Sequence, residues 1–142
     1  MAVIKRAQYK SPNDIKPVFY ADINAQFQIH PNTRDLSVVD NEDAVKGSIR
    51  NILLTRRGER FFNPSFGSDI YRILFENAST AADNDLRTFI TTALENFEPR
   101  ARLINLNVTS YPDDNGYVIT IVFSVINRTE PVTLNILLDR IR

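Results

Sequence analysis

The sequence has no cysteine, one histidine and four scattered glycines, and each scarcity removes a class of function. Without cysteine the chain has no disulfides, no thiolate metal site and no cysteine nucleophile. The single histidine, His30, cannot make a multi-histidine metal site or a histidine relay, and beside Pro31 a structural role in a turn is favoured. The glycines form no phosphate-binding loop. We therefore expect no metal, no cofactor and no catalytic residues.

Long hydrophobic runs and an excess of either charge are also missing. No apolar run approaches the length of a membrane span, and residues 1–10 contain no hydrophobic stretch of signal-peptide length. Lys+Arg and Asp+Glu balance at 17 each, so bulk attraction to nucleic acid or an anionic membrane is not predicted. A cysteine-free chain suits folding in a reducing cytosol. The length of 142 residues indicates one domain.

The N-terminal third is expected to be extended. Residues 1–17 are basic and contain two prolines, which favours an extended arm; a disordered tail is the commoner alternative, and an arm that orders on a partner is the functional one. The single domain then covers residues 18–142. Residues 19–29 alternate apolar and polar side chains and predict an extended, one-sided segment or strand. A turn at 30–35 and a short strand at 36–39 follow.

Two principal helices are predicted. The first covers residues 41–57, with Asp40 as N-cap, Arg56 and Arg57 in the last turn, and Gly58 closing it. A short helix is expected within 67–75, with Ile70 and Leu74 facing inward. The second principal helix begins after a cap at 79 or 80 and ends at 97, because the proline at 99 cannot continue it.

Three strands complete the chain, at about 103–111, 117–126 and 132–141. The first two are joined by a hairpin turn at 112–116, since Asn115-Gly116 accepts positive φ at little cost. The order of elements predicts an α+β domain. In it, the two helices pack on a C-terminal antiparallel β-meander, preceded by an N-terminal extended arm or strand.

Glu98, Pro99 and Arg100 lie where the helical period changes to the strand period. This corner holds an acid and a guanidinium close together in a fixed geometry. Such an arrangement suits docking onto a partner more readily than catalysis.

A glycosidase is the competing interpretation of the carboxylates. Glu59 and Glu98 could act as its acid and nucleophile, about 5 Å or more apart. However, Arg60 and Arg100 follow them closely, and pairing with an arginine keeps a carboxylate ionised, which is unsuitable for a general acid. The acidic run at 113–116 lacks calcium-loop spacing and is assigned to the hairpin turn.

The last predicted strand can lie at a sheet edge. Leu134, Ile136 and Leu138 share one face, with Leu137 on the other. An exposed apolar edge invites strand addition by a partner, whereas a covered edge is the ordinary alternative.

Several stretches together resemble one family. They are 22–23, 30–36, 48–55, 58–60, 63–68, 74–76 and 98–100, in this order and spacing. The chain resembles the baseplate wedge and sheath-initiator family of contractile-tailed phages, also called tail-lysozyme-like and shared with the type VI secretion baseplate. The resemblance covers about 20–140. Arg34 departs from it, because the family often has glycine there, which puts the turn geometry in question.

The resemblance implies a structural protein of the virion tail baseplate, assembled in the host cytoplasm. Glu98, Pro99 and Arg100 would contact a helical core bundle made by other wedge proteins. Residues 132–141, with Leu134, Ile136 and Leu138, would template strands of the first tail sheath subunits. By our own inference Glu59 and Arg60 would support the corner. A cell-wall-degrading tail lysozyme and a regulatory adaptor remain the alternatives.

Overall fold

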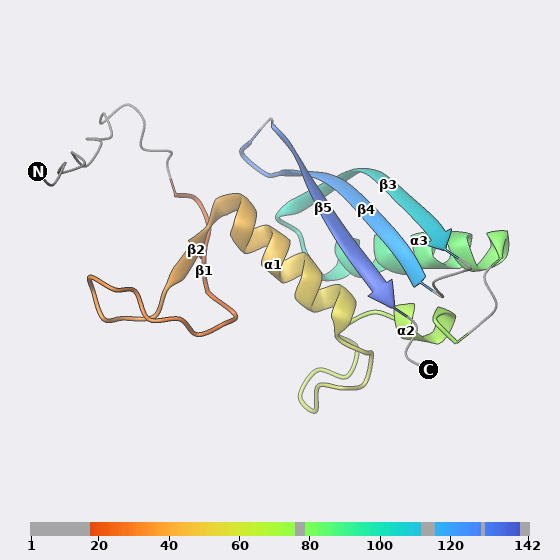
Figure 1. Ribbon diagram of the computed structural model, residues 1–142, viewed down its shortest axis with the longest axis horizontal. Coiled ribbons are helices and arrows are strands. Elements are labelled where there is room, and N and C mark those ends of the chain that lie inside the picture. Colours follow the sequence, from red (N-terminus) through yellow and green to blue (C-terminus); the bar gives the residue numbers. More distant parts are fainter. Residues whose placement is uncertain (1–17, 76–78, 112–115, 129, 140–142) are drawn as a thin grey trace, which may run out of the picture.

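The computed structural model describes residues 18–75, 79–111, 116–128 and 130–139. It is an α+β fold, as predicted, and Figure 1 shows an N-terminal hairpin, two longer helices and a C-terminal sheet. The elements are β1 (Ala21–Ile23), β2 (Val38–Asp40), α1 (Asn41–Leu54), α2 (Ile70–Ile73), α3 (Thr80–Phe97), β3 (Ala101–Tyr111), β4 (Gly116–Val125) and β5 (Pro131–Asp139). The predicted arm at 1–17 and most of the predicted turn at 112–116 lie outside the described residues.

The C-terminal meander is an antiparallel sheet in the order β3-β4-β5. Every second side chain of β4 is buried, and α3 runs behind the sheet in Figure 1. The core between sheet and helices is therefore built from alternating strand positions and helical stripes. Its fully buried members include Ile49, Ile52, Leu86, Ile90, Ile119, Ile121 and Phe123.

Helix α1 buries Val45, Ile49, Ile52 and Leu53 along one face and ends at Leu54, three residues before the predicted end. Thr55 is extended, and the next residue, Arg56, forms a parallel bridge with Ser68. This long-range pairing removes Arg56 and Arg57 from the helix. Asp40 occupies the N-cap position as predicted, although its side chain makes no capping hydrogen bond.

The start and end of α3 agree with the prediction. Ser79 Oγ accepts a hydrogen bond from the Ala82 N–H at 3.2 Å, and the helix ends at Phe97. The short helix α2 is narrower than its predicted window, but Ile70 and Leu74 are buried as expected.

The prediction of one continuous extended segment or strand over 19–29 is wrong. Only the three residues of β1 pair with β2, and an isolated bridge joins Ile29 to Leu36. Between them Phe27 has φ 51°, which breaks the extended run. Tyr20 packs against the core, whereas the alternating apolar side chains are exposed, namely Phe19, Ile23, Phe27 and Ile29. The hairpin therefore projects from the body, as Figure 1 shows.

The turn of this hairpin is fixed by local hydrogen bonds. His30 Nδ1 accepts from the Asn32 N–H at 3.3 Å, which agrees with the structural role expected of that histidine. Arg34 has φ 56°, a value that glycine adopts more easily, so the turn forms despite the departure noted above.

Candidate functional site

The corner at 98–100 is a tight turn between α3 and β3. The Ala101 N–H donates to the Glu98 carbonyl at 3.2 Å, which leaves Pro99 in the turn position that suits its fixed φ. Arg100 donates from Nε to Glu98 Oε1 at 2.8 Å and from Nη2 to Oε2 at 3.1 Å. This bidentate pairing confirms that the acid and the guanidinium lie close together.

The same guanidinium also contacts the N-terminal hairpin. Arg100 donates from Nη1 and Nη2 to Asp22 Oδ2, both at 3.2 Å, and its Cζ lies 5.6 Å from the centre of the Tyr20 ring. Asp22 belongs to β1, so Arg100 joins the first strand of the chain to the α3–β3 corner.

The Glu98–Arg100 pair is ionised, and its carboxylate is buried from solvent. Glu98 is 2% exposed. Burial by itself raises the pKa of Glu98, but hydrogen bonds from Arg100 and Ser48, together with the charge of Arg100, outweigh it and lower the pKa from its usual 4.5. The hydrogen bond to Glu98 in turn raises the pKa of Arg100. A carboxylate held in this way is a poor proton donor.

The three corner residues differ in what they offer to a partner. Glu98 is buried and cannot itself contact another protein in this structure. Pro99 is exposed, and the Arg100 side chain is 25% exposed. Any docking at the corner therefore involves Pro99 and one edge of Arg100, with Glu98 positioning the guanidinium.

Glu59 and Arg60 lie apart from the corner, on the loop formed by residues 56–68. Glu59 Oε2 accepts from the Arg56 N–H at 2.9 Å and so braces its own loop. The Arg60 guanidinium lies 3.9 Å from the centre of the Phe66 ring, which in turn packs on Phe97 at 5.1 Å between ring centres. Arg60 thus reaches the end of α3 through two rings.

A groove of about 290 Å³ connects these parts. It lies between the N-terminal hairpin, α1 and the 56–68 loop, and its lining includes Asp22, Ser48, Arg60 and Phe66. Asp22 and Ser48 are the partners of Arg100 and Glu98, which places the groove beside the corner. Sequence reasoning missed both of them as partners, because nothing in the local pattern marks a contact to so distant a residue.

The last strand, β5, lies at the sheet edge as predicted, and no described strand pairs with its outer side. Leu134, Ile136 and Leu138 point into the core, while Leu137 is exposed. These three leucine and isoleucine side chains are thus unavailable to a partner. What the edge offers is its backbone.

The direction of that backbone follows from one hydrogen bond. The Ile126 N–H donates to the Arg100 carbonyl, which lies on the opposite strand. The backbone N–H and C=O groups of even-numbered β4 residues therefore point to β3, and those of odd-numbered residues point to β5. The odd-numbered residues pair with Val132, Leu134, Ile136 and Leu138. In β5, Thr133, Asn135 and Leu137 therefore direct their N–H and C=O groups to the free edge.

Among residues 18–75, 79–111, 116–128 and 130–139, no group of three or more His, Asp or Glu side chains is placed to hold a metal ion. No helix in these ranges is long and apolar enough to cross a membrane.

Comparison with known proteins gives sequence matches over most of the chain. The family model described as baseplate wedge protein gp25 matches residues 39–130. The baseplate wedge protein gp25 of Enterobacteria phage T4 is 33% identical over 113 residues, which covers 80% of this chain and 85% of that protein.

Solved structures share the fold of this chain. A putative tail lysozyme from Geobacter sulfurreducens is 26% identical, with a TM-score of 0.65 over 71% of this chain and 92% of its own. A chain of the anti-feeding prophage baseplate is 18% identical, with a TM-score of 0.60 over 87% of each chain. At 18% identity, the second match concerns the fold alone.

Proposed function

Because the chain belongs to the family of the baseplate wedge protein gp25, we propose that it docks on the helical core bundle of the wedge and initiates sheath polymerisation by strand addition. Membership makes it a structural baseplate component of a contractile tail. The partners named in the proposal are other wedge proteins and tail sheath subunits, with assembly in the host cytoplasm.

The docking part of the proposal is supported by the geometry of the corner. Glu98 and Asp22 hold Arg100 from two sides, so Pro99 and the open edge of Arg100 stand in a fixed position on the surface. Rigid presentation lowers the entropy lost when a partner binds. This fixed corner is the observation that carries the proposal.

A substitution on the exposed residue of the corner tests docking without disturbing the buried pair. Pro99→Glu adds a charge at a turn position that most residues tolerate, so the fold should persist while binding to purified wedge proteins from the same tail weakens. Asn105→Glu adds the same charge at an exposed position of β3 and serves as the control. Equal binding by both variants and the wild type would contradict docking at the corner.

Strand addition is supported by the free side of β5. Its Thr133, Asn135 and Leu137 backbone groups face away from β4, and the described residues supply no strand to pair with them. An added strand would extend the sheet through main-chain hydrogen bonds, while the side chains of Leu134, Ile136 and Leu138 stabilise the strand from the core.

We propose that the protein is not an enzyme, against the alternative of a cell-wall glycosidase. The lowered pKa of Glu98 keeps it ionised, and Glu59 is engaged with the Arg56 N–H on its own loop. Neither carboxylate is suited to be a general acid. Muralytic activity that is present in the wild type and lost in Glu59→Gln would overturn this part of the proposal.

A further inference from the structure

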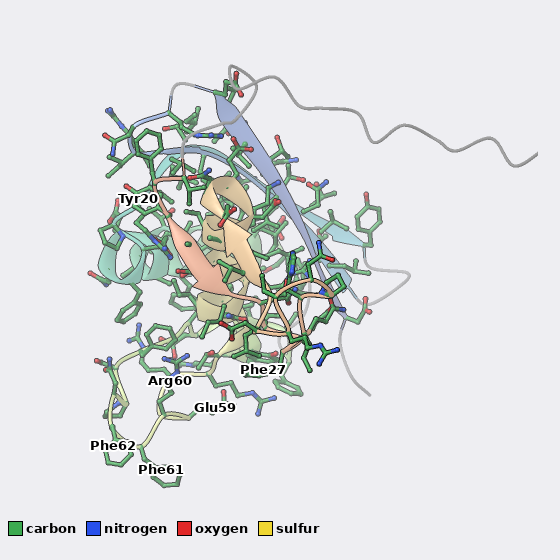
Figure 2. All side chains as sticks on the ribbon, turned by 90° about the vertical axis from the view of Figure 1, so that its left-hand side faces the viewer. Tyr20, Phe27, Glu59, Arg60, Phe61 and Phe62 are labelled. Carbon is green, nitrogen blue, oxygen red and sulfur yellow. The ribbon has the colours of Figure 1, made fainter. Side chains whose placement is uncertain are left out.

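Phe61 and Phe62 are the most exposed large apolar side chains among the described residues. Phe61 is 97% exposed and Phe62 is fully exposed. Figure 2 shows both rings at the outer end of the 56–68 loop, farther from the body of the protein than Arg60. Single apolar residues on a surface are ordinary, but two adjacent and almost fully exposed aromatic rings mark an interaction site.

Hydrogen bonds hold the 56–68 loop, which carries these rings, in a defined conformation. At its base the Ser68 N–H donates to the Thr55 carbonyl at 3.0 Å, and Ser68 Oγ donates to the Leu53 carbonyl at 2.7 Å. Within it the Gly58 N–H donates to the Pro64 carbonyl at 2.8 Å. Little conformational freedom is therefore left for binding to remove.

Glycine at position 67 is required at the base of the loop. Its φ is +112°, and a Cβ there would lie 2.5 Å from the Thr55 carbonyl oxygen. A side chain at this position would force the two arms of the loop apart. The chain thus fixes the geometry of a loop that exposes Phe61 and Phe62 at its tip.

The charge beside the rings indicates what kind of surface they meet. Arg60 is exposed, its guanidinium lies over Phe66, and no carboxylate of the described residues forms an ion pair with it. A partner that covers Phe61 and Phe62 also covers this cation. An apolar hollow bordered by a carboxylate complements both features.

We propose that Phe61 and Phe62 insert into an apolar hollow of the wedge core bundle and that a bundle carboxylate pairs with Arg60. This inference rests on the docking function proposed above and names a second contact for it. The groove is lined by Arg60 and Phe66 and also by Asp22 and Ser48, so it joins the loop to the residues that hold the corner. One partner surface can therefore engage the rings, the groove and the corner together.

The decisive experiment measures binding of the full chain to the purified wedge subassembly that lacks it, by biolayer interferometry. The double variant Phe61→Ser/Phe62→Ser is expected to lose at least tenfold in affinity, as truncated aromatic anchors do, with an unchanged melting temperature. Ile104→Ser removes a 57% exposed apolar side chain from β3 and is expected to bind like the wild type. Arg60→Glu should weaken binding as well.

Each other outcome counts against the inference. Binding of the double variant within twofold of the wild type rejects the anchors and leaves the docking function standing. If the wild-type chain itself does not bind the subassembly, the docking function fails and this inference fails with it. If the wild type self-associates in sedimentation and the double variant does not, the rings meet a second copy of the chain instead.

Gly67→Ala, which distorts the loop and keeps both rings, should also lose affinity; wild-type affinity there would contradict the need for a fixed loop.

Discussion

Arg100 and Asp22 are 78 positions apart in the sequence, yet Arg100 Nη1 lies 3.2 Å from Asp22 Oδ2. Together with the bidentate bonds to Glu98, this ion pair ties the projecting N-terminal hairpin to the corner between α3 and β3. The corner is therefore a contact within the fold before it is a contact with any partner, and its variants affect stability.

Replacing Arg100 by alanine is expected to lower the free energy of unfolding by about 3 kcal/mol, because it leaves the buried Glu98 carboxylate without its counter-charge. Arg100→Lys keeps the charge and loses the bidentate geometry, so it should fall between alanine and the wild type. Urea unfolding at neutral pH measures all three.

Arg102→Ala provides the matched control, since Arg102 is exposed and lies two residues along the chain. A surface substitution of this kind should change stability by no more than about 0.5 kcal/mol. If Arg100→Ala is no less stable than Arg102→Ala, the pairing with Glu98 does not contribute as argued. Loss of wedge binding by Arg100→Ala also has to be interpreted together with this loss of stability.

The pH dependence of stability follows from the lowered pKa of Glu98. Its folded pKa lies below the usual 4.5, so its contribution is present above pH 4.5 and is lost as the pH falls through the folded value. Glu98→Gln removes the titrating group, so the free energy of unfolding should depend less steeply on pH in the acid range. This acid range of the curve of stability against pH is the acid limb. Urea unfolding at several pH values between 3 and 7 measures the slope. Glu95→Gln, which removes an exposed carboxylate of α3, should leave the limb unchanged; an equally flattened curve there would contradict the assignment to Glu98.

The helices and the meander could be predicted because local patterns decide them. The apolar stripe of α3, the Ser79 cap and the proline at 99 all agree with one helix, and the alternation in β4 matches a strand packed on a core. The end of α1 could not be predicted in this way. Arg56 leaves the helix to bridge Ser68, and a pairing across 12 positions leaves no mark in the local period.

The same distinction between local patterns and long-range contacts applies to the candidate site. The closeness of Glu98 and Arg100 follows from a two-residue spacing across a proline turn and was predicted. Asp22 and Ser48 join them only through the folded chain. The alternation at 19–29 predicts an extended, one-sided segment or strand, but the apolar side chains of this run face solvent. A period of two reports the geometry of the backbone and does not show what covers either face.

The free edge of β5 gives the last prediction, for sheath initiation. Truncating the chain after Pro131 is unsuitable, because it removes four buried side chains, Val132, Leu134, Ile136 and Leu138, and with them part of the core. The substitution Asn135→Pro tests the edge without removing any of these core side chains. Its N–H faces the free edge, so proline there removes a donor for an added strand and keeps the hydrogen bonds to β4.

The expected result is a folded protein that joins the baseplate but does not support sheath growth, scored by electron microscopy of tails assembled with each variant. Asn135→Ala changes the same side chain, keeps the N–H and should support normal growth. Leu134→Pro removes an N–H that faces β4 and is expected to unfold the domain, which checks the assignment of backbone direction. Normal sheath assembly on baseplates that contain Asn135→Pro would show that the sheath does not begin by pairing with this edge.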